Sequence, residues 1–182
     1  GEDFEAYNRK PMFRYNAYFG IHTVHYLDVV VVEEGGELGL PGLVVGAALA
    51  RGLRIAGVAR SATPALTPWA VKLVSRAATL KFVSYVGEDG HPRILPGVAA
   101  CTAGSGRVVV ACPRDDPATA LIPNGADVAV FALDRDLHSV LLRGRATIRR
   151  SIAGASMSAL DVDWVYNSMP PKHGQIYPQV SC

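Results

Sequence analysis

Between Thr67 and Arg150 the chain alternates apolar runs with glycine- and aspartate-rich turns at short, regular intervals. Alternation such as Phe82/Ser84/Val86 against Val83/Tyr85 is typical of strands, and glycine or aspartate between such runs is typical of chain reversals. The pattern therefore predicts a series of antiparallel hairpins. The predicted strands are Leu80–Val86, Arg93–Cys101, Arg107–Cys112, Ala126–Leu133 and Ser139–Ile148.

A short helix is predicted before the first strand. The hydroxyl of Thr67 can accept a backbone N–H of the first turn, and Pro68 suits the first helical position, where no donor is needed. The apolar side of this helix is expected to consist of Trp69, Val71, Leu73 and Val74.

The strand series is expected to close on itself. Val108, Val109 and Val110 place apolar residues on both faces of one strand, and closure removes exposed strand edges. The predicted fold class is mainly β (α+β): an antiparallel barrel with a few accessory helices, in one domain over residues 1–182. The composition, 49% hydrophobic and 19% charged, agrees with a large core or a subunit interface.

Two segments flank the predicted barrel core of residues 67–150. Residues 1–60 are expected to form an extension packed on the barrel, with strand-like residues at 12–34, a helix over Pro41–Arg51 that Gly52 ends, and a strand over Arg54–Val58. Residues 160–182 are expected to form a tail. The tail either covers a ligand groove, with Trp164, Lys172 or His173 near the ligand, or docks across a partner subunit, which we favour.

Charge and cysteine usage exclude several functions. A net charge of +2 is too small to indicate a nucleic-acid-binding surface. Residues 38–58 are interrupted by proline and arginine, so no membrane span is predicted, and a cytoplasmic location follows from the absence of a signal peptide. Three cysteines without CxxC spacing argue against a zinc site or a disulfide scaffold. His22 and His25 would point to opposite faces of a strand, so no metal site is predicted.

The run that follows the helix, Leu80-Lys-Phe-Val-Ser-Tyr-Val-Gly-Glu-Asp-Gly-His-Pro-Arg-Ile-Leu-Pro, resembles the opening of the pyridoxamine 5'-phosphate oxidase-like, FMN-binding split-barrel family. Gly106–Arg114 is similar to the family's third strand and phosphate loop, and Asp127–Ile148 to its next strand pair. The resemblance covers about half of the chain. It implies an antiparallel split β-barrel, a homodimer, and FMN in a groove between the two copies.

The resemblance also implies site residues. Arg93 and Arg114 are the phosphate candidates, because a guanidinium fork matches phosphate oxygens. Two acids, Asp115 and Asp116, stand where the family commonly has Ser-x-Lys, which opposes phosphate binding. The predicted cofactor-binding residues are Arg93, Ile94, Leu95, Pro96 and Gly97 on one strand, Cys112, Pro113 and Arg114 in the loop, and Thr119 and Trp164.

Two functions follow from the resemblance. The first is an FMN-dependent or deazaflavin-dependent oxidoreductase with a small-molecule redox substrate. No catalytic side chain is assigned in this case, because the cofactor carries the chemistry. The alternative is a non-catalytic dimeric barrel for flavin storage, ligand sensing or scaffolding, whose phosphate site is degraded.

Overall fold

The computed structural model describes residues 28, 29, 48, 52, 63–96, 100–113, 122–152, 155–167 and 174–179, with backbone alone at 111–113, 148–152 and 155–157. Asp28 and Val29 lie in neither a helix nor a strand, whereas Ala48 and Gly52 are both helical. Gly52 is therefore part of a helical segment and does not follow it. The rest of the predicted N-terminal extension, including His22 and His25, lies outside the described residues.

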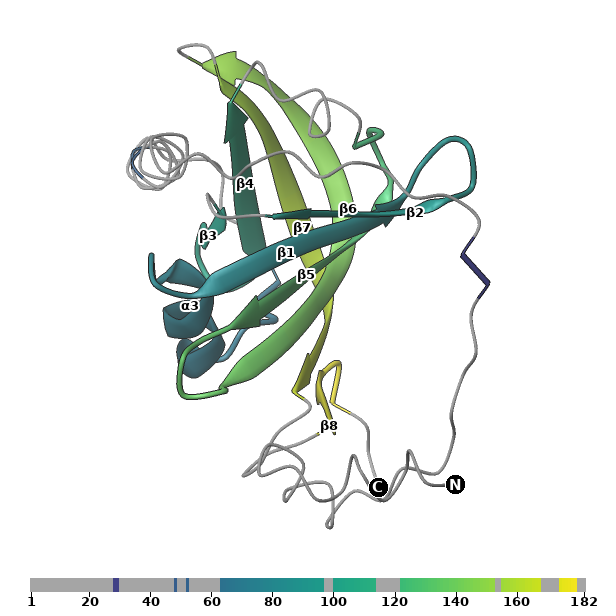
Figure 1. Cartoon of the computed structure of the whole chain (residues 1–182). Coiled ribbons are helices and arrows are strands. Elements are labelled where there is room, and N and C mark those ends of the chain that lie inside the picture. The colour runs from purple at the N-terminus through teal and green to yellow at the C-terminus, as the bar shows by residue number, and fades with distance from the viewer. Residues whose placement is uncertain are drawn as a thin grey trace. The chain divides into compact units, whose positions relative to one another are not determined.

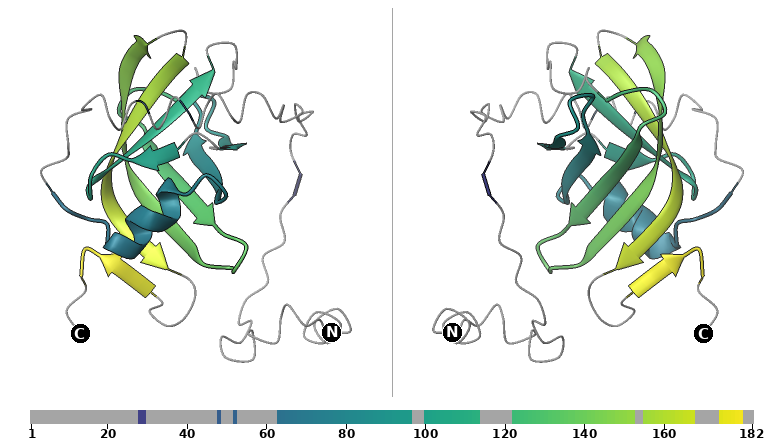
Figure 2. Two further views of the ribbon diagram at one scale, coloured as in Figure 1. Left: turned by 90° about the vertical axis from the view of Figure 1, so that its left-hand side faces the viewer. Right: turned by 90° about the vertical axis from the view of Figure 1, so that its right-hand side faces the viewer.

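Residues 38–182 form one compact unit, and the sheet within it is antiparallel throughout, in the order β2-β1-β5-β6-β7-β4-β3, with β8 paired to β7. The sheet curls around a core with α3 at one side (Figures 1 and 2). The predicted antiparallel split barrel is therefore confirmed. The elements are α3 (Pro68–Ser75), β1 (Leu80–Val86), β2 (Pro92–Pro96), β3 (Ala100–Thr102), β4 (Arg107–Pro113), β5 (Asp127–Leu133), β6 (Ser139–Ile152), β7 (Ala155–Asn167) and β8 (Gly174–Tyr177).

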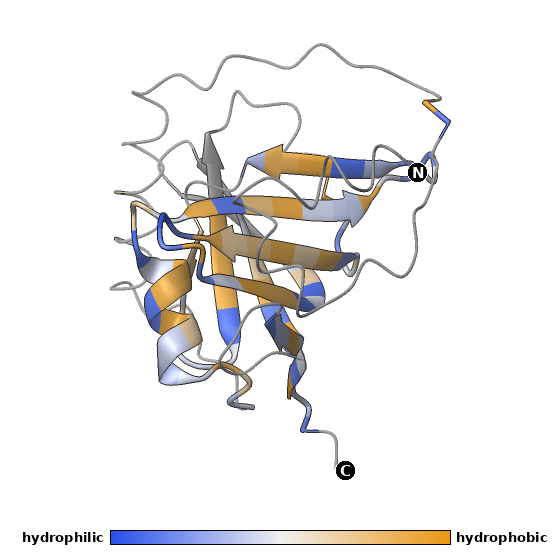
Figure 3. Ribbon diagram, turned by 60° about the horizontal axis from the view of Figure 1, so that its bottom comes forward, coloured by the Kyte–Doolittle hydropathy of each residue, from blue (hydrophilic) through white to orange (hydrophobic). Residues whose placement is uncertain are grey.

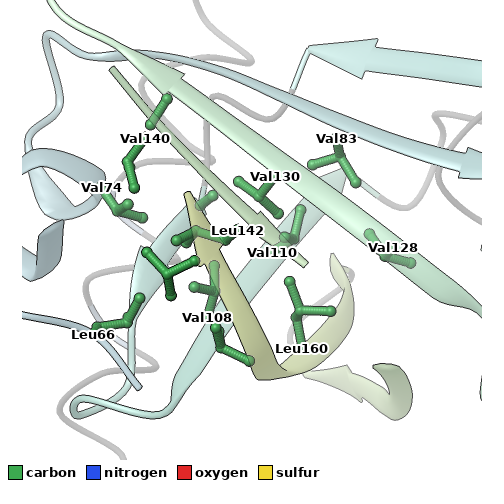
Figure 4. Close-up of a cluster of buried hydrophobic side chains, with 14 of the residues drawn as sticks. Leu66, Val74, Val83, Val108, Val110, Val128, Val130, Val140, Leu142 and Leu160 are labelled. Atoms are coloured by element: carbon green, nitrogen blue, oxygen red, sulfur yellow. The ribbon is translucent and has the colours of Figure 1, made fainter. Parts of the chain in front are cut away.

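The core lies on the inner face of the curled sheet. Val83 and Tyr85 of β1 are buried, while Leu80 and Val86 are each 60% exposed on the opposite face, as the alternation predicts. Figure 4 shows valines and leucines from β1, β4, β5, β6 and β7 converging, with Val74 of α3 beside them. Burial of such side chains, each contributing about 1.5–3 kcal/mol, is the main source of stability for this barrel.

Helix α3 begins as expected and packs against β3, β5 and β6. The backbone N–H of Ala70 donates to Thr67 Oγ1 at 3.3 Å, and Ala70, Leu73 and Val74 are buried. Trp69 was expected on the buried side, but it is 38% exposed. Its ring instead meets that of His138 edge to face, with the centroids 6.4 Å apart.

Two polar contacts hold the C-terminal end of α3. The hydroxyls of Ser75 and Thr102 share a hydrogen bond of 2.8 Å, which ties the helix to β3. Lys81, which is 3% exposed on β1, donates from Nζ to the carbonyl oxygen of Arg76 at 2.8 Å. A cation is favourable there, because the carbonyls at a helix C-terminus carry partial negative charge.

Two of the differences between predicted and observed boundaries change the strand assignment. The predicted strand Arg93–Cys101 is divided into β2 and β3, with residues 97–99 outside the description. The predicted tail begins within β7, which lies between β6 and β4 and is therefore a central strand. Within this strand Asp161 lies opposite Arg107 on β4.

Cys101 lies opposite Val109 and Cys112 lies opposite Ser156, so the two cysteines do not lie opposite each other in the sheet. No helix among the described residues is long and apolar enough to cross a membrane.

Candidate functional site

The register of the sheet aligns outward-pointing side chains into two adjacent rows across β2, β1, β5, β6 and β7. Residues directly opposite each other in antiparallel pairs point to the same side of the sheet. We call these two rows together the outer face. The first row is Ile94, Ser84, Ala129, Arg143 and Trp164, and the second is Pro96, Phe82, Phe131, Leu141 and Tyr166.

The outer face is unusually apolar for an exposed surface. Ile94 is 71% exposed and Phe82 is 38% exposed. Leu80 and Val86 extend the apolar surface along β1 in both directions, and Figure 3 shows hydrophobic stretches on adjacent strands of the sheet. Contiguous exposed apolar residues of this kind mark interaction or ligand-binding surfaces.

At the β7 side of the outer face, two aromatic rings and a cation lie together. The rings of Trp164 and Tyr166 are stacked, with centroids 5.5 Å apart and planes 3° from parallel. The guanidinium carbon of Arg143 lies 5.5 Å from the Trp164 ring centroid, within cation–π range. Arg143 Nε is also 3.6 Å from Asp163 Oδ1. The arrangement presents flat aromatic surface beside a positive charge.

Gly144 makes this register possible. A Cβ at Gly144 would lie 1.9 Å from the carbonyl oxygen of Asp161, so β6 and β7 can approach here only because the residue is glycine. The pairing of the two strands shifts between Arg143 and Gly144, which sets Arg143 opposite Trp164. An ion pair between β4 and β7 lies at the same position along β7. Arg107 of β4 donates from Nε and a terminal nitrogen to the Asp161 carboxylate at 2.6 and 2.9 Å.

The phosphate candidate on β2 has an acidic neighbour. Arg93 lies opposite Tyr85, on the inner face near the edge of the sheet. Its guanidinium donates to Asp89 Oδ2 at 2.8 Å, while Asp89 Oδ1 accepts the backbone N–H of His91 at 3.1 Å. The hydrogen bond from the His91 N–H, aided by the Arg93 guanidinium, holds the pKa of Asp89 below its usual value. The carboxylate is therefore ionised at neutral pH.

The structure brings only some of the predicted site residues together. Ile94, Pro96 and Trp164 lie on the outer face, whereas Arg93 and Leu95 point to the inner face. The backbone of Cys112 and Pro113 forms the end of β4, opposite Ser156 and Ala155. The other predicted positions lie outside the described residues: Gly97, Arg114, Asp115, Asp116, Thr119, Lys172 and His173.

Sequence reasoning missed most of the outer face. Phe82, Phe131, Leu141 and Tyr166 were not among the predicted site residues, nor was Arg143. A signal was present in β1, where Leu80, Phe82 and Val86 are apolar at the positions that alternate with the buried Val83 and Tyr85. Apolar residues on both faces of a strand indicate that both faces meet something apolar.

Within the described residues, one cluster has the composition of a metal site. Asp134, Asp136 and His138 bring their potential ligand atoms within 4.8 Å of one another in the β5–β6 turn. However, Asp134 Oδ1 accepts the backbone N–H groups of Asp136 and His138 at 3.0 and 2.9 Å. These hydrogen bonds give the Asp134 carboxylate a structural role, because they stabilise the turn.

Comparison with known proteins adds information on the fold. No family model and no curated protein matches the sequence. Among solved structures, HupZ of Group A Streptococcus is 17% identical with a TM-score of 0.51, over 60% of this chain and 98% of that one. A putative pyridoxamine 5'-phosphate oxidase of Lactobacillus delbrueckii is 21% identical with a TM-score of 0.46, over 58% of this chain and 96% of that one.

A Clostridium acetobutylicum protein described as of the pyridoxinephosphate oxidase family is 13% identical with a TM-score of 0.44, over 57% of this chain and 88% of that one. Identities this low concern the fold alone. With a TM-score of 0.51, the likeness to HupZ agrees with the antiparallel split-barrel fold that the strand order shows.

Proposed function

We propose that this chain is an FMN-binding oxidoreductase that acts on a small-molecule redox substrate as a homodimer. The observation that carries the proposal is the outer face. It combines exposed apolar residues, a stacked aromatic pair and a cation on one side of a split barrel. This is the surface that a subunit interface with a flat ring at its margin requires.

The described residues fit the ring of FMN but not, in the same place, its phosphate. Arg93, the phosphate candidate, projects to the inner face of β2, four strands away from Trp164 in the sheet order. Trp164 and Tyr166 offer aromatic surface to a flat ring, with Arg143 beside them. Bound FMN would supply the hydride or electron transfer, while these side chains bind and orient it.

The homodimer is supported by the same surface. A stable interface buries roughly 800 Å² on each partner, with an apolar centre and a polar rim. Phe82, Ile94 and Phe131 would form the centre. Two exposed ion pairs lie on the outer side of the sheet and would form the rim: Arg143–Asp163 at 3.6 Å and Arg145–Asp127 at 3.5 Å.

A titration of purified protein with FMN, followed by absorbance and flavin fluorescence, tests the proposal. We expect wild-type protein to bind FMN and turn yellow. Trp164→Ala should weaken FMN binding about two- to thirteenfold, since an aromatic contact contributes about 0.5–1.5 kcal/mol. Trp69→Ala removes an exposed tryptophan from α3 and serves as the matched control. Protein that remains colourless and ignores added FMN would refute the proposal.

The alternative function, a non-catalytic dimeric barrel, has a specific observation in its favour. The guanidinium of Arg93 already holds the Asp89 carboxylate, which is the state expected of a phosphate site that is no longer used. Under this alternative, the dimer persists without redox catalysis, and protein that stays colourless with added FMN favours it.

A further inference from the structure

β2 is the terminal strand of the sheet that the structure describes, and among the described strands it pairs with β1 alone. A strand in this position presents backbone N–H and C=O groups along its open edge, and another chain can use them as a template for pairing. Ile94 in the middle of β2 is 71% exposed, and Pro92 and Pro96 at its two ends are exposed as well. An open edge beside an exposed apolar residue favours pairing between copies of a chain unless something prevents it.

The register shows which backbone groups of β2 face the open edge. In an antiparallel pair, residues that exchange backbone hydrogen bonds with the partner strand alternate with residues whose backbone groups point away from it. The N–H of Gly87 donates to the carbonyl oxygen of His91 at 2.9 Å, so the hydrogen-bonded residues of β2 are the alternate ones that follow, Arg93 and Leu95. The backbone groups that point to the open edge belong to the remaining residues of β2: Pro92, Ile94 and Pro96.

Two of these three residues have no N–H to donate, because they are prolines. If two copies paired antiparallel through this edge about a two-fold axis at Ile94, Pro92 of each copy would lie opposite Pro96 of the other. Three residues on each of two copies could form six hydrogen bonds if all had an N–H, but the prolines leave only the two that Ile94 donates. An edge strand with its nitrogen toward solvent is the position that proline occupies in sheets.

We propose that Pro92 and Pro96 close the edge of β2 to strand pairing, so that a second copy of this chain reaches this end of the sheet only through the outer face. The closed edge depends on the register and on the two prolines, whereas association through the outer face rests on the proposed function. Ile94 takes part in both, because its side chain points to the outer face while its backbone groups point along the plane of the sheet.

Amide hydrogen exchange in the wild-type protein, followed residue by residue by NMR, tests the geometry of the edge. The N–H groups of Arg93 and Leu95 donate to β1, whereas that of Ile94 faces the open edge. After correction for intrinsic rates, the Ile94 amide should therefore exchange about tenfold faster than the other two, or more. An Ile94 amide as slow as its two neighbours would overturn the proposal, because another strand would then cover the edge.

The double variant Pro92→Ala/Pro96→Ala returns both donors without adding a large apolar side chain. The symmetric edge pair would gain four hydrogen bonds, each worth at least about twofold in affinity. In sedimentation velocity, the variant should form species larger than the wild-type species at concentrations about 16-fold lower than the wild type does, or lower still. Pro64→Ala is the matched control, because Pro64 is exposed and lies in neither a helix nor a strand.

Circular dichroism and urea midpoints verify that each variant is folded, and the two single variants replace the double variant if it does not fold. The proposal predicts larger species and a slowed Ile94 amide in the proline variants at positions 92 and 96, and wild-type behaviour in Pro64→Ala. Folded variants that sediment as the wild type does and keep a fast Ile94 amide show that the prolines do not close the edge. A monomeric wild type overturns the homodimer and the role given to the outer face, while the exchange pattern still decides whether the edge is closed.

Discussion

Gly144→Ala should be among the most destabilising conservative substitutions in this barrel. The added Cβ would lie 1.9 Å from the Asp161 carbonyl oxygen, 2.7 Å from its carbonyl carbon and 3.0 Å from Val162 Cα. Ordinary van der Waals contact begins near 3.4 Å, so β6 and β7 must separate by about 1.5 Å to accept a Cβ that would lie 1.9 Å from the oxygen. All three atoms belong to the backbone, which no side-chain rotation can move away. We therefore expect a loss at the upper end of the overpacking range, about 3 kcal/mol.

Equilibrium unfolding in urea measures this loss, because domains of this size usually unfold cooperatively enough for midpoints to be compared. Gly90→Ala is the matched control. Gly90 has a φ of +78°, but nothing lies within 4 Å of its added Cβ. That variant should lose only the cost of a strained backbone, about 1 kcal/mol. If Gly144→Ala is no less stable than Gly90→Ala, the close approach of β6 and β7 is not as described.

Two further predictions concern charge and assembly. Burial lowers the pKa of Lys81 from its ordinary value of 10.5, so the unfolded chain binds more protons than the folded one between the lowered pKa and 10.5. The wild type should therefore gain stability relative to Lys81→Met as the pH rises through that window. Urea midpoints at several pH values measure this gain. If the difference in stability between the two proteins does not change with pH, Lys81 is not buried as described. Ile94→Glu should dissociate the proposed homodimer, because two-fold symmetry buries the new charge once on each copy. Leu137→Glu is the control: it places the same charge at a 49% exposed leucine in the β5–β6 turn, and it should sediment as the wild type does. If Ile94→Glu forms dimers with the affinity of the wild type, the proposed interface is wrong.

Local features of the sequence predicted local structure well. Thr67 and Pro68 start α3 where the capping rules place it, because a cap depends on residues within one turn. The limits of β1 were predicted correctly because the Gly87–Gly90 turn ends it, and Gly90 adopts the left-handed backbone that such turns favour. The prediction for Trp69 failed because burial of a helix residue depends on where distant strands lie.

The candidate site was harder to predict because it depends on register. Trp164 and Tyr166 are separated from Phe82 by some eighty residues of chain, yet β7, β6, β5 and β1 carry Tyr166 and Phe82 in one row. A shift of one residue in any pair of strands would turn these side chains toward the other face. Hairpin turns fix the β5–β6 register locally, but the irregular pairing at Arg143 and Gly144 could be located only in the structure.

Alternation along β2 places Arg93 and Ile94 on opposite faces of the sheet. In the interior of a sheet, such residues could not serve one ligand. β2 is the terminal strand of the described sheet, and Trp164 on β7 lies four strands away from it in the same row of the outer face, roughly 19 Å at about 4.8 Å per strand. The ribityl chain that joins the ring of FMN to its phosphate is too short for that distance. A ring that stacks on Trp164 therefore takes its positive charge from Arg143, which lies beside it, and not from Arg93.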